Sequence, residues 1–399
     1  MMSVREPILF IEINNSKFKF VVGDFNENKN LELVHTIDIP LQGINDKKIN
    51  DLKLVSNIIK ENIFLIERKL NFVFKEAIFV ADCFESFVIS FSGFKKLNGS
   101  QLSKDNITYM LNLLMSKISE VENQKKIIHI FNSKYVLDKK EINNLPIGLF
   151  GNLYSQEISF ILIDNNDYKN LNYVFENCNL RIKKIISKKF LDGVNIINKN
   201  LNLETFLKIQ INENDTELIY FENSALKFVQ NFKFGSNLIL NDISKVTGLN
   251  NDTIKKILLS FKFSDKNLDL EIVEKEFFKS QNFRKIRKKL IFDIAKVRIE
   301  ELSEVLIYKN INVISFLRGN LSIFLKINDS SHLKCFYDCF KKNFSKNEQF
   351  ITNFTSDLSS SEIYNSVSSI VQYGWKKEAV PIVQEKKSVI SRLFHKIFS

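Results

Sequence analysis

The sequence predicts an α/β protein that uses one βββαβα plan twice, with a small α+β unit inserted in the first copy. Two observations lead to this prediction. Three strand patterns, a helix pattern and a further strand follow one another near residues 8–80. A pattern of strand, polar turn, strand and strand begins again at residue 205. Because internal duplication is a signature of fold, the two segments are expected to form two similar halves.

In the first copy, apolar runs and alternation indicate strands, and apolar residues three or four apart indicate a helix. The predicted elements are strands at 8–13, 18–22 and 31–40, a helix at 51–72 and a strand at 76–82. Asn14 and Asn15 form a tight turn between the first two strands, because asparagine tolerates turn conformations. Pro40 stops the third strand.

The next segment alternates between strand and helix patterns, which predicts a small α+β unit over 84–163. Its predicted elements are a strand at 85–94, a helix at 103–123 and strands at 126–138 and 154–164. Ser103 is a plausible N-cap for the helix. After this unit, helices at 168–179 and 188–200 enclose a short strand at 181–187.

The second copy begins with three strands within 204–235. The elements predicted after it are helices at 236–248, 250–261 and 280–310, a strand at 311–317 and a last helix at 361–374. Gly248 should end the first of these helices, and Asn251 or Asp252 should cap the second. The residues expected to face the core from the long helix are Ile286, Leu290, Ile294, Val297 and Leu302.

Composition limits the class of protein. The 399 residues are 44% hydrophobic and 26% charged, as in a globular protein, and no apolar run is long enough to span a bilayer. Four cysteines in a chain of this length predict no disulfide framework, and the short apolar N-terminal run is no secretion signal, so a cytoplasmic protein is expected. The net charge of +11 leaves a nucleic-acid-binding protein as an alternative, although a general bias toward Asn, Lys, Ile and Phe explains the charge.

Candidate catalytic and metal-binding residues are few. His332, Cys335 and Cys339 share a predicted helix face but have no fourth ligand, so they predict no metal site. His35, His129 and His395 stand isolated in the sequence, and no serine or cysteine nucleophile has an evident partner. With 11 glycines, the chain also contains no glycine-rich phosphate loop, because neither GxGxxG nor GxxxxGK[ST] occurs.

Several stretches, in order along the chain, carry a family resemblance. They are FIEINNSK at 10–17, NLPIGLFGNLY at 144–154 with Pro146, Gly148 and Gly151, FGSNLILNDIS at 234–244, VRIEEL at 297–302 and NSVSSIVQYG at 365–374. Together they resemble the bacterial cell-division protein FtsA. The resemblance implies the actin-like (ribonuclease H-like) fold of actin and heat-shock-chaperone ATPases, with an inserted subdomain and a C-terminal amphipathic membrane-targeting helix.

The resemblance also implies a division of the chain into domains. The first half would comprise 1–83 and 164–199, with the inserted subdomain at 84–163 between them. The second half would comprise 200–375, followed by a linker at 376–385 and the membrane-targeting helix at 386–399.

The family binds ATP with Mg²⁺, and the resemblance places the corresponding positions on two turns and nearby helices. They are Glu12, Asn14, Asn15, Ser16, Lys17, Gln210, Asn212, Asn214, Thr216, Gly235, Lys255 and Gly319. Gln210 stands where the family has an acid, and Asn212, Glu213 and Asn214 replace glycines. An amide supplies no charge for Mg²⁺, and side chains obstruct the close approach of phosphate. We therefore expect no catalytic residues and no efficient ATPase, while ATP binding and an active ATPase remain open alternatives.

The last residues of the chain are basic and amphipathic. The apolar residues Ile390, Leu393, Phe394, Ile397 and Phe398 recur at helical spacing, beside the basic residues Lys386, Lys387, Arg392 and Lys396. Burying each large side chain in a membrane contributes about 1.5–3 kcal/mol, and each basic residue adds about 1 kcal/mol at an anionic surface. Ordering the backbone costs about 1–2 kcal/mol per residue, so one tail would bind reversibly and a polymer more firmly. Docking on the chain's own domain or on a partner is the alternative.

The resemblance implies a function in tethering. It predicts self-assembly into a homopolymer, binding to anionic lipids and binding to the C-terminal peptide of FtsZ near Arg298 and Glu301. An ion pair within the helix is the alternative for these two residues. The expected location is the cytoplasmic face of the inner membrane, at the division site, with no nucleic-acid partner.

Overall fold

The computed structural model divides the chain into two compact units. Unit 1 comprises Met1–Ile196, Asn223–Lys227 and Ser360–Ser399, and unit 2 comprises Ile197–Glu222 and Phe228–Ser359. The residues that the structure describes are 6–26, 31–200, 202–260, 271–278, 283–316, 319–328, 331–356, 358–375 and 378. The predicted tail at 386–399, the linker residues 376, 377 and 379–385, and Arg318 therefore lie outside the described residues.

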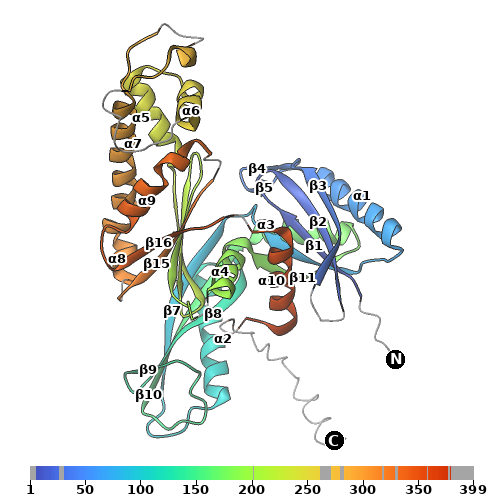
Figure 1. The fold of residues 1–399 in the computed structure, drawn as a ribbon. Helices are drawn as coiled ribbons and strands as arrows, with labels where there is room; N and C mark the ends of the chain where they lie inside the picture. Colours follow the sequence, from blue (N-terminus) through green and yellow to red (C-terminus); the bar gives the residue numbers. More distant parts are fainter. Residues whose placement is uncertain are drawn as a thin grey trace, which may run out of the picture. The chain divides into compact units, whose positions relative to one another are not determined.

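The central sheet of unit 1 has five strands in the order β11-β6-β1-β2-β3 (Figure 1). Their bounds are β1 Ile8–Ile13, β2 Lys17–Phe25, β3 Leu31–Pro40, β6 Glu76–Ala81 and β11 Arg181–Ser187. β1, β2 and β3 form an antiparallel meander, while β6 runs parallel to both β1 and β11. All the strands predicted for the first copy are therefore present, and β1 lies at the centre of the sheet.

Helices cover both faces of this sheet. Successive side chains of a strand point to opposite faces, so Ile11 joins the core under α1 (Leu52–Leu70) and α3 (Asn165–Asn177). Phe10 lies on the other face, where its ring is 5.2 Å from that of Tyr364 in α10 (Ser360–Tyr373). The remaining elements of this part of the unit are α4 Lys188–Lys199 and a small hairpin of β4 Ile44–Asn45 and β5 Lys48–Ile49.

The inserted segment of unit 1 forms a second, fully antiparallel sheet in the order β7-β10-β8-β9. Its strands are β7 Ser86–Lys96, β8 Lys125–Leu137, β9 Lys140–Ile142 and β10 Leu153–Asp164. The apolar face of α2 (Lys104–Val121) packs on it through Met110, Leu114 and Ile118. Ser103 caps α2 as predicted. Its hydroxyl oxygen accepts the Asn106 N–H, and the Asn106 side-chain oxygen accepts the Ser103 N–H.

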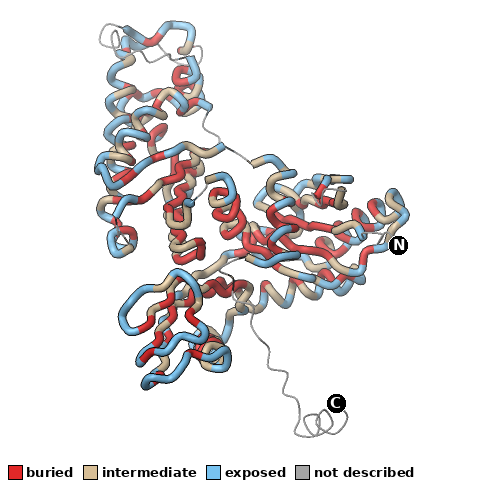
Figure 2. The backbone as a smooth tube through the Cα atoms, turned by 60° about the horizontal axis from the view of Figure 1, so that its bottom comes forward, coloured by how far each residue is buried: buried red, intermediate tan, exposed pale blue. Residues whose placement is uncertain are grey.

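The sheet of unit 2 repeats the strand order of the first, as β14-β13-β12-β15-β16. Its strands are β12 Phe206–Ile211, β13 Thr216–Glu222, β14 Ala225–Phe232, β15 Leu321–Ile327 and β16 Phe350–Phe354. Here too the strand that comes first in the chain is central. β12 is antiparallel to β13 and parallel to β15, and β15 is parallel to β16. This repetition confirms the duplicated plan. In both units, buried residues concentrate along the strands and on the helix sides that face them (Figure 2).

The other described elements of unit 2 share one large apolar core. They are α5 Asn237–Thr247, α6 Asn251–Ser260, η1 Lys275–Phe278, α7 Lys288–Ser303, η2 Glu304–Tyr308, α8 Ile311–Phe316, η3 Ser331–Phe336 and α9 Tyr337–Phe344. Gly248 ends α5 as predicted, with φ of 66° in the left-handed region, and its N–H bonds the Ser244 carbonyl at 2.7 Å. No helix among these and the other described elements is long and apolar enough to cross a membrane.

Three predictions for the second copy were wrong. The strand expected at 311–317 is the helix α8, because the Asn310 side chain accepts the Asn312 N–H at 3.1 Å and so starts a helix. The cap of α6 is Asn250 rather than Asn251 or Asp252, since Asn250 Oδ1 accepts the Thr253 N–H at 2.8 Å.

The buried face of α7 also differs from the predicted one. Leu290 and Val297 are 42% and 65% exposed, and Ile286 is buried but precedes the helix. The residues that α7 buries are Ile291, Ala295, Ile299, Leu302 and Ser303. Of the predicted set, Leu302 is correct and Ile294 is partly buried against the core. The predicted row of apolar residues began at Ile286, before α7 begins at Lys288. It therefore follows a helix face next to the one that α7 buries.

Candidate functional site

The first predicted phosphate turn lies between β1 and β2 of unit 1, and its own side chain occupies its amides. Asn14 Oδ1 accepts the backbone N–H groups of Ser16 at 3.0 Å and Lys17 at 2.9 Å, and the Ser16 hydroxyl at 3.0 Å. The Asn14 N–H donates to the Lys17 carbonyl at 3.1 Å, which closes the turn. The Asn14 side chain thus accepts the hydrogen bonds of the turn's own backbone N–H groups, so those groups already have an acceptor.

Glu12, at the end of β1, is 5% exposed and is held on both carboxylate oxygens. Tyr364 Oη donates to Oε2 at 2.8 Å, and Lys188 Nζ lies 3.2 Å from Oε1. Burial opposes the charge on Lys188, but the attraction of Glu12, Asp192 and Asp82 outweighs it and raises the Lys188 pKa. Burial, reinforced by Glu12, raises the pKa of Tyr364. Glu12 therefore ties β1 to α4 and α10.

The second predicted turn, between β12 and β13 of unit 2, is held together by side-chain amides. Asn212 donates its N–H to the Asp215 carbonyl at 2.9 Å and its Nδ2 to Asp215 Oδ2 at 2.7 Å. Asn212 Oδ1 accepts Asn328 Nδ2 at 2.7 Å and Gln210 Nε2 at 3.3 Å. Side chains thus take the place that glycines would leave open to a ligand.

The start of α5 is joined to this turn through backbone hydrogen bonds. The Ser236 N–H donates to the Asn212 carbonyl at 2.8 Å, and the Asn237 N–H donates to the Glu213 carbonyl at 2.9 Å. Gly235 permits this approach, because a Cβ there would lie 2.1 Å from the Asn212 carbonyl oxygen. The first N–H groups of a helix often bind phosphate, but here the turn accepts two of those donors.

The other nearby positions form local pairs in the same unit. Lys255 Nζ, on α6, lies 3.3 Å from Glu213 Oε1, so a carboxylate already partners the lysine assigned to phosphate. Thr216 Oγ1 donates to the Phe234 carbonyl at 2.8 Å, and Asn214 Oδ1 accepts Asn237 Nδ2 at 2.9 Å. Gly319, just before β15, has φ of 93°, and a Cβ added there would meet no atom within 4 Å, so its surroundings are open. These contacts are local to unit 2, as those of Glu12 and Asn14–Lys17 are local to unit 1.

Arg298, the predicted partner-binding residue on α7, makes two ion pairs within unit 2. Its Nε donates to Asp242 Oδ2 on α5, and its Nη1 donates to Glu301 Oε2 at 2.5 Å. The hydrogen bond to Asp242 is the main cause of a raised Arg298 pKa. Sequence spacing predicted the pair with Glu301 as an alternative, but it missed Asp242, which comes from a different helix.

The chain after α10 is attached to unit 1 by two side chains that sequence reasoning did not select. Trp375 Nε1 donates to the Ser224 carbonyl at 2.8 Å. Glu378 Oε1 lies 2.8 Å from His129 Nδ1, and Glu378 Oε2 lies 2.8 Å from Lys184 Nζ. The sequence suggested that His129 is isolated, but it has a partner. That partner, Glu378, lies 249 residues further along the chain, so no local pattern connects the two.

The protonation of His129 follows from its contacts. Its Nε2 accepts the Ser187 N–H at 3.1 Å, so Nδ1 carries the proton that is donated to Glu378. Burial lowers the His129 pKa below its ordinary value of 6.5, although Glu378 opposes the shift. Burial would raise the Glu378 pKa, but the hydrogen bond from His129 and the charge of Lys184 outweigh it and lower that pKa. A neutral histidine and an ionised glutamate therefore hold residue 378 in place.

Potential metal ligands do not cluster in the described part of the chain. No three His, Cys, Asp or Glu side chains there come together as metal ligands. The thiols of Cys335 and Cys339 are partly buried, and burial raises the pKa of Cys335 to about 12.

The comparison with known proteins agrees with the fold. No protein-family model matches the chain. The cell division protein FtsA of Buchnera aphidicola subsp. Acyrthosiphon pisum (strain APS) is 21% identical over 412 residues, which cover 96% of this chain and 94% of that protein. The chain resembles FtsA. FtsA of Escherichia coli (strain K12) is 19% identical over 258 residues, covering 61% of this chain and 58% of that protein.

A solved structure shares the fold of this chain. A chain of the PilM-PilN type IV pilus biogenesis complex matches with a TM-score of 0.54 and 11% identity, covering 93% of this chain and 99% of that one. At this identity the likeness concerns the fold alone. Together with the two sheets of equal strand order, it confirms the predicted duplicated actin-like α/β fold.

Proposed function

We propose that this chain is an FtsA-like cell-division protein that tethers FtsZ filaments to the cytoplasmic membrane. The observation that carries the proposal is the similarity to an FtsA over 96% of this chain and 94% of the relative, which supports a role in cell division. In the proposal, the actin-like body assembles into a polymer, α7 binds the C-terminal peptide of FtsZ, and the tail binds anionic lipid. The work is mechanical attachment, with no need for catalysis.

The attachment of residue 378 limits how far the proposed tail can lie from unit 1. Residues 379–385 follow the contacts of Glu378 with His129 and Lys184 and precede Lys386. Those residues can extend over at most about 25 Å at 3.3–3.6 Å each. The start of the tail would therefore stay close to unit 1, and a polymer would hold many tails at high effective concentration.

Tethering predicts that the chain brings FtsZ filaments to vesicles that contain anionic lipid, and that Arg298→Glu weakens this recruitment. The substitution removes a guanidinium suited to a partner carboxylate and adds an acid beside Asp242 and Glu301. We expect affinity for the FtsZ C-terminal peptide to fall at least about tenfold. The measurement is co-sedimentation of FtsZ filaments with vesicles, together with peptide binding.

Lys296→Glu is the matched control, because it makes the same charge change at an exposed position on another face of α7. It should retain binding. Melting temperatures of both variants separate lost binding from lost folding. Equal peptide affinity in wild type and a folded Arg298→Glu variant would leave Arg298 with the structural role that its two ion pairs describe.

We further propose that the nucleotide site is degraded. Both phosphate turns are satisfied by their own side chains, and Glu213 both neutralises Lys255 and would repel phosphate. Restoring a site would require these side-chain bonds to break. The rival function is an active actin-like ATPase whose assembly is controlled by nucleotide.

A thermal-shift titration with Mg-ATP distinguishes the two. A ligand at a hundred times its dissociation constant stabilises the folded state by about 2.7 kcal/mol, which should raise the melting temperature by about 5 °C or more. We expect no rise at millimolar Mg-ATP. A saturable rise would favour the rival, and ATP turnover would then measure how much of the ATPase chemistry survives.

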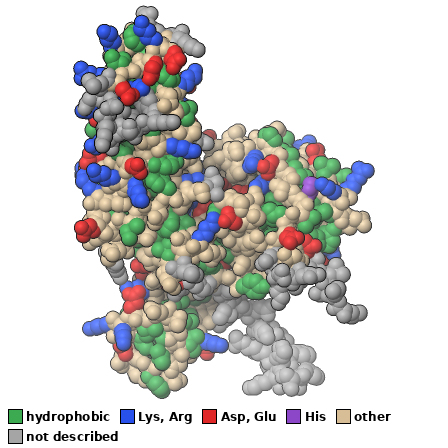
Figure 3. Space-filling model, viewed as in Figure 1, with side chains coloured by type: hydrophobic (Ala, Val, Ile, Leu, Met, Phe, Trp, Pro, Cys, Tyr) green, Lys and Arg blue, Asp and Glu red, His purple; other side chains and the backbone are tan. Residues whose placement is uncertain are grey.

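A nucleic-acid-binding protein is less favoured by the surface. On the face drawn in Figure 3, lysine and arginine side chains are scattered among acidic ones, whereas a nucleic-acid interface gathers them into a patch or stripe. Many described lysines also pair with carboxylates of their own unit, including Lys125, Lys183 and Lys288.

A further inference from the structure

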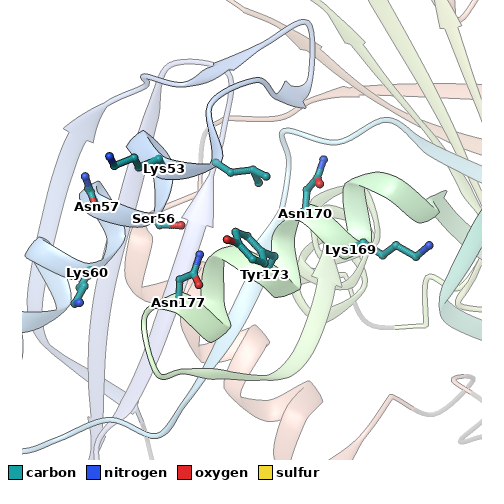
Figure 4. Close-up of a pocket in the computed structure, with 9 residues that line it drawn as sticks. Lys53, Ser56, Asn57, Lys60, Lys169, Asn170, Tyr173 and Asn177 are labelled. Atoms are coloured by element: carbon teal, nitrogen blue, oxygen red, sulfur yellow. The ribbon is translucent and has the colours of Figure 1, made fainter.

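A groove of about 740 Å³ between α1 and α3 of unit 1 gathers no charge around one ligand. In Figure 4 the ammonium ends of Lys53 and Lys169 point away from the space between the two helices. The Ser56 Oγ that lines the groove is buried and offers a ligand no surface. The inserted sheet of the same unit has a different feature, an exposed apolar surface bordered by lysines.

This apolar surface lies at one end of the inserted sheet, where the loop 143–152 joins β9 to β10 (Figure 1). The apolar tip comprises five large residues that are 40–72% exposed: Phe94, Ile147, Leu149, Phe150 and Leu153. Figure 3 shows hydrophobic side chains gathered on this part of the unit, in the lower part of the view. Single exposed apolar residues are ordinary, but a group of large ones indicates a contact surface.

Backbone hydrogen bonds fix the loop of the apolar tip. The Leu102 N–H donates to the Leu149 carbonyl, and the Gly148 N–H donates to the Leu102 carbonyl, both at 2.9 Å. The Leu149 N–H closes a turn on the Pro146 carbonyl at 3.2 Å, with Gly148 at a φ of 84°. Because glycine adopts a positive φ without strain, the turn can hold Ile147 and Leu149 at the surface on either side of it.

The rest of the tip lies on the sheet face that α2 leaves open. Gly93 faces α2, since a Cβ there would meet side chains of that helix, so the next residue, Phe94, points to the opposite face. In the register of β7 and β10, Phe94 is opposite Ser155, and Lys96 is opposite Leu153. Phe94 and Leu153 are therefore diagonal neighbours on one face, within reach of each other.

Exposed lysines border the apolar tip, at Lys96, Lys139 and Lys140. None of the three has an ion pair within the described part of the chain. The neighbouring Asp138 is occupied, because its Oδ1 accepts two backbone N–H groups at the start of β10, both at 2.8 Å. Glu141 is paired with a lysine of β8 at 2.8 Å. Of these five charged residues, the lysines are the ones left free.

This combination fits the surface of an anionic bilayer. Apolar side chains gain free energy by inserting among lipid headgroups, and lysines around them are attracted to anionic lipid. The position also fits, because the bridge between Phe131 and Glu378 holds residue 378 on β8, about 20 Å from the end of that strand at Leu137. The linker 379–385 spans at most about 25 Å, so the proposed tail and the tip can reach one membrane surface.

We propose that the apolar tip inserts into the surface of an anionic bilayer, with Leu149 and Phe150 among the headgroups and the three lysines at the lipid phosphates. The proposal rests on the proposed function for the membrane as the location, but the contact itself depends on neither the tail nor α7. Two contacts on unit 1 would fix its orientation on the membrane, which a single contact does not.

The test uses the full chain and vesicles of equal parts phosphatidylglycerol and phosphatidylcholine. Leu149→Ser/Phe150→Ser should lower the affinity for these vesicles at least about tenfold, because two large apolar side chains no longer insert. Phe64→Ser/Leu65→Ser, on α1, is the matched control, since its two residues are 62% and 55% exposed, compared with 50% and 69% for the pair in the tip. The control should change the affinity less than about twofold, and melting temperatures check that both variants fold.

A second measurement asks whether the tip enters the lipid. Phe150→Trp adds an indole to the tip, and the wild type, with Trp375 alone, gives the background emission. Vesicles whose acyl chains carry bromine should quench the added emission, because insertion brings the indole close to the chains. An added indole that these vesicles leave unquenched would overturn the insertion.

Both double variants are also measured together with Phe394→Glu, which separates the tip from the tail. If Phe394→Glu leaves binding undiminished, the tail fails as an anchor, while a tenfold loss in the tip variant still supports the tip. Equal affinity of the tip variant and its control, with the natural tail, would overturn the tip and leave the tethering function standing. Loss of self-assembly without loss of vesicle affinity in the tip variant would also overturn it, because the tip would then contact a second copy of the chain.

Discussion

Phe394→Glu is expected to release the protein from anionic vesicles. The proposed tail binds by burying Ile390, Leu393, Phe394, Ile397 and Phe398 in the bilayer surface. Losing one buried phenylalanine costs about 1.5–3 kcal/mol, and a new negative charge costs about 1 kcal/mol more at an anionic surface. The apparent affinity should therefore fall by about a hundredfold, as measured by co-sedimentation with vesicles below the concentration at which the protein assembles.

Ser388→Glu is the matched control, because it adds the same charge at a position that helical spacing places opposite the apolar residues. It should lower the affinity only about fivefold, through electrostatics alone. Equal losses in the two variants would show that charge rather than apolar burial holds the tail. Undiminished binding of Phe394→Glu would eliminate the tail as the membrane anchor, and with it the tethering function.

Gly235→Ala should destabilise unit 2 by about 3 kcal/mol or more. The added Cβ would lie 2.1 Å from the Asn212 carbonyl oxygen and 2.7 Å from that of Glu213. Both are backbone atoms of a turn held by hydrogen bonds to Asp215 and to the start of α5, so neither can move without breaking those bonds. Denaturation in urea, followed by far-ultraviolet circular dichroism, measures the loss as an earlier transition.

Gly93→Ala provides the comparison, since its Cβ would also meet an atom at 2.7 Å, but that atom is Cγ of Met110. The buried Met110 side chain can shift where a backbone carbonyl cannot, at the cost of repacking the core around it, so the cost should be about 1–2 kcal/mol. If both substitutions shift their transitions equally, the close approach of Gly235 to the turn is not the constraint that we describe.

Local chemistry in the sequence predicted most of the elements and the position of the turns after β1 and β12, which the family resemblance matched to phosphate turns. Alternation and apolar runs indicated the strands on each side of Asn14 and Asn212, and polar residues between them indicated the turns. Ser103 and Gly248 were predictable as helix ends because each acts within three or four residues of itself. The run at 311–316 misled because β-branched residues resemble a strand, while one capping side chain at Asn310 was sufficient to start a helix.

The state of the nucleotide turns could be anticipated only in part. The absence of glycines at 212–214 was visible in the sequence, and it predicted an obstructed site. The side chains that complete the turn were not visible, because Asn328 reaches Asn212 from a strand end 116 residues away. Spacing along the chain gives no information about which distant amide will complete a turn.

The sequence by itself determined the duplicated order of strands and helices and the amphipathic pattern of the last residues, because periodicity and turn chemistry act over a few neighbouring residues. Only the tertiary structure decided which distant side chains meet: Asp242 with Arg298, and Glu378 with His129. Those pairings depend on how helices pack on a sheet, which brings together residues that no local pattern connects.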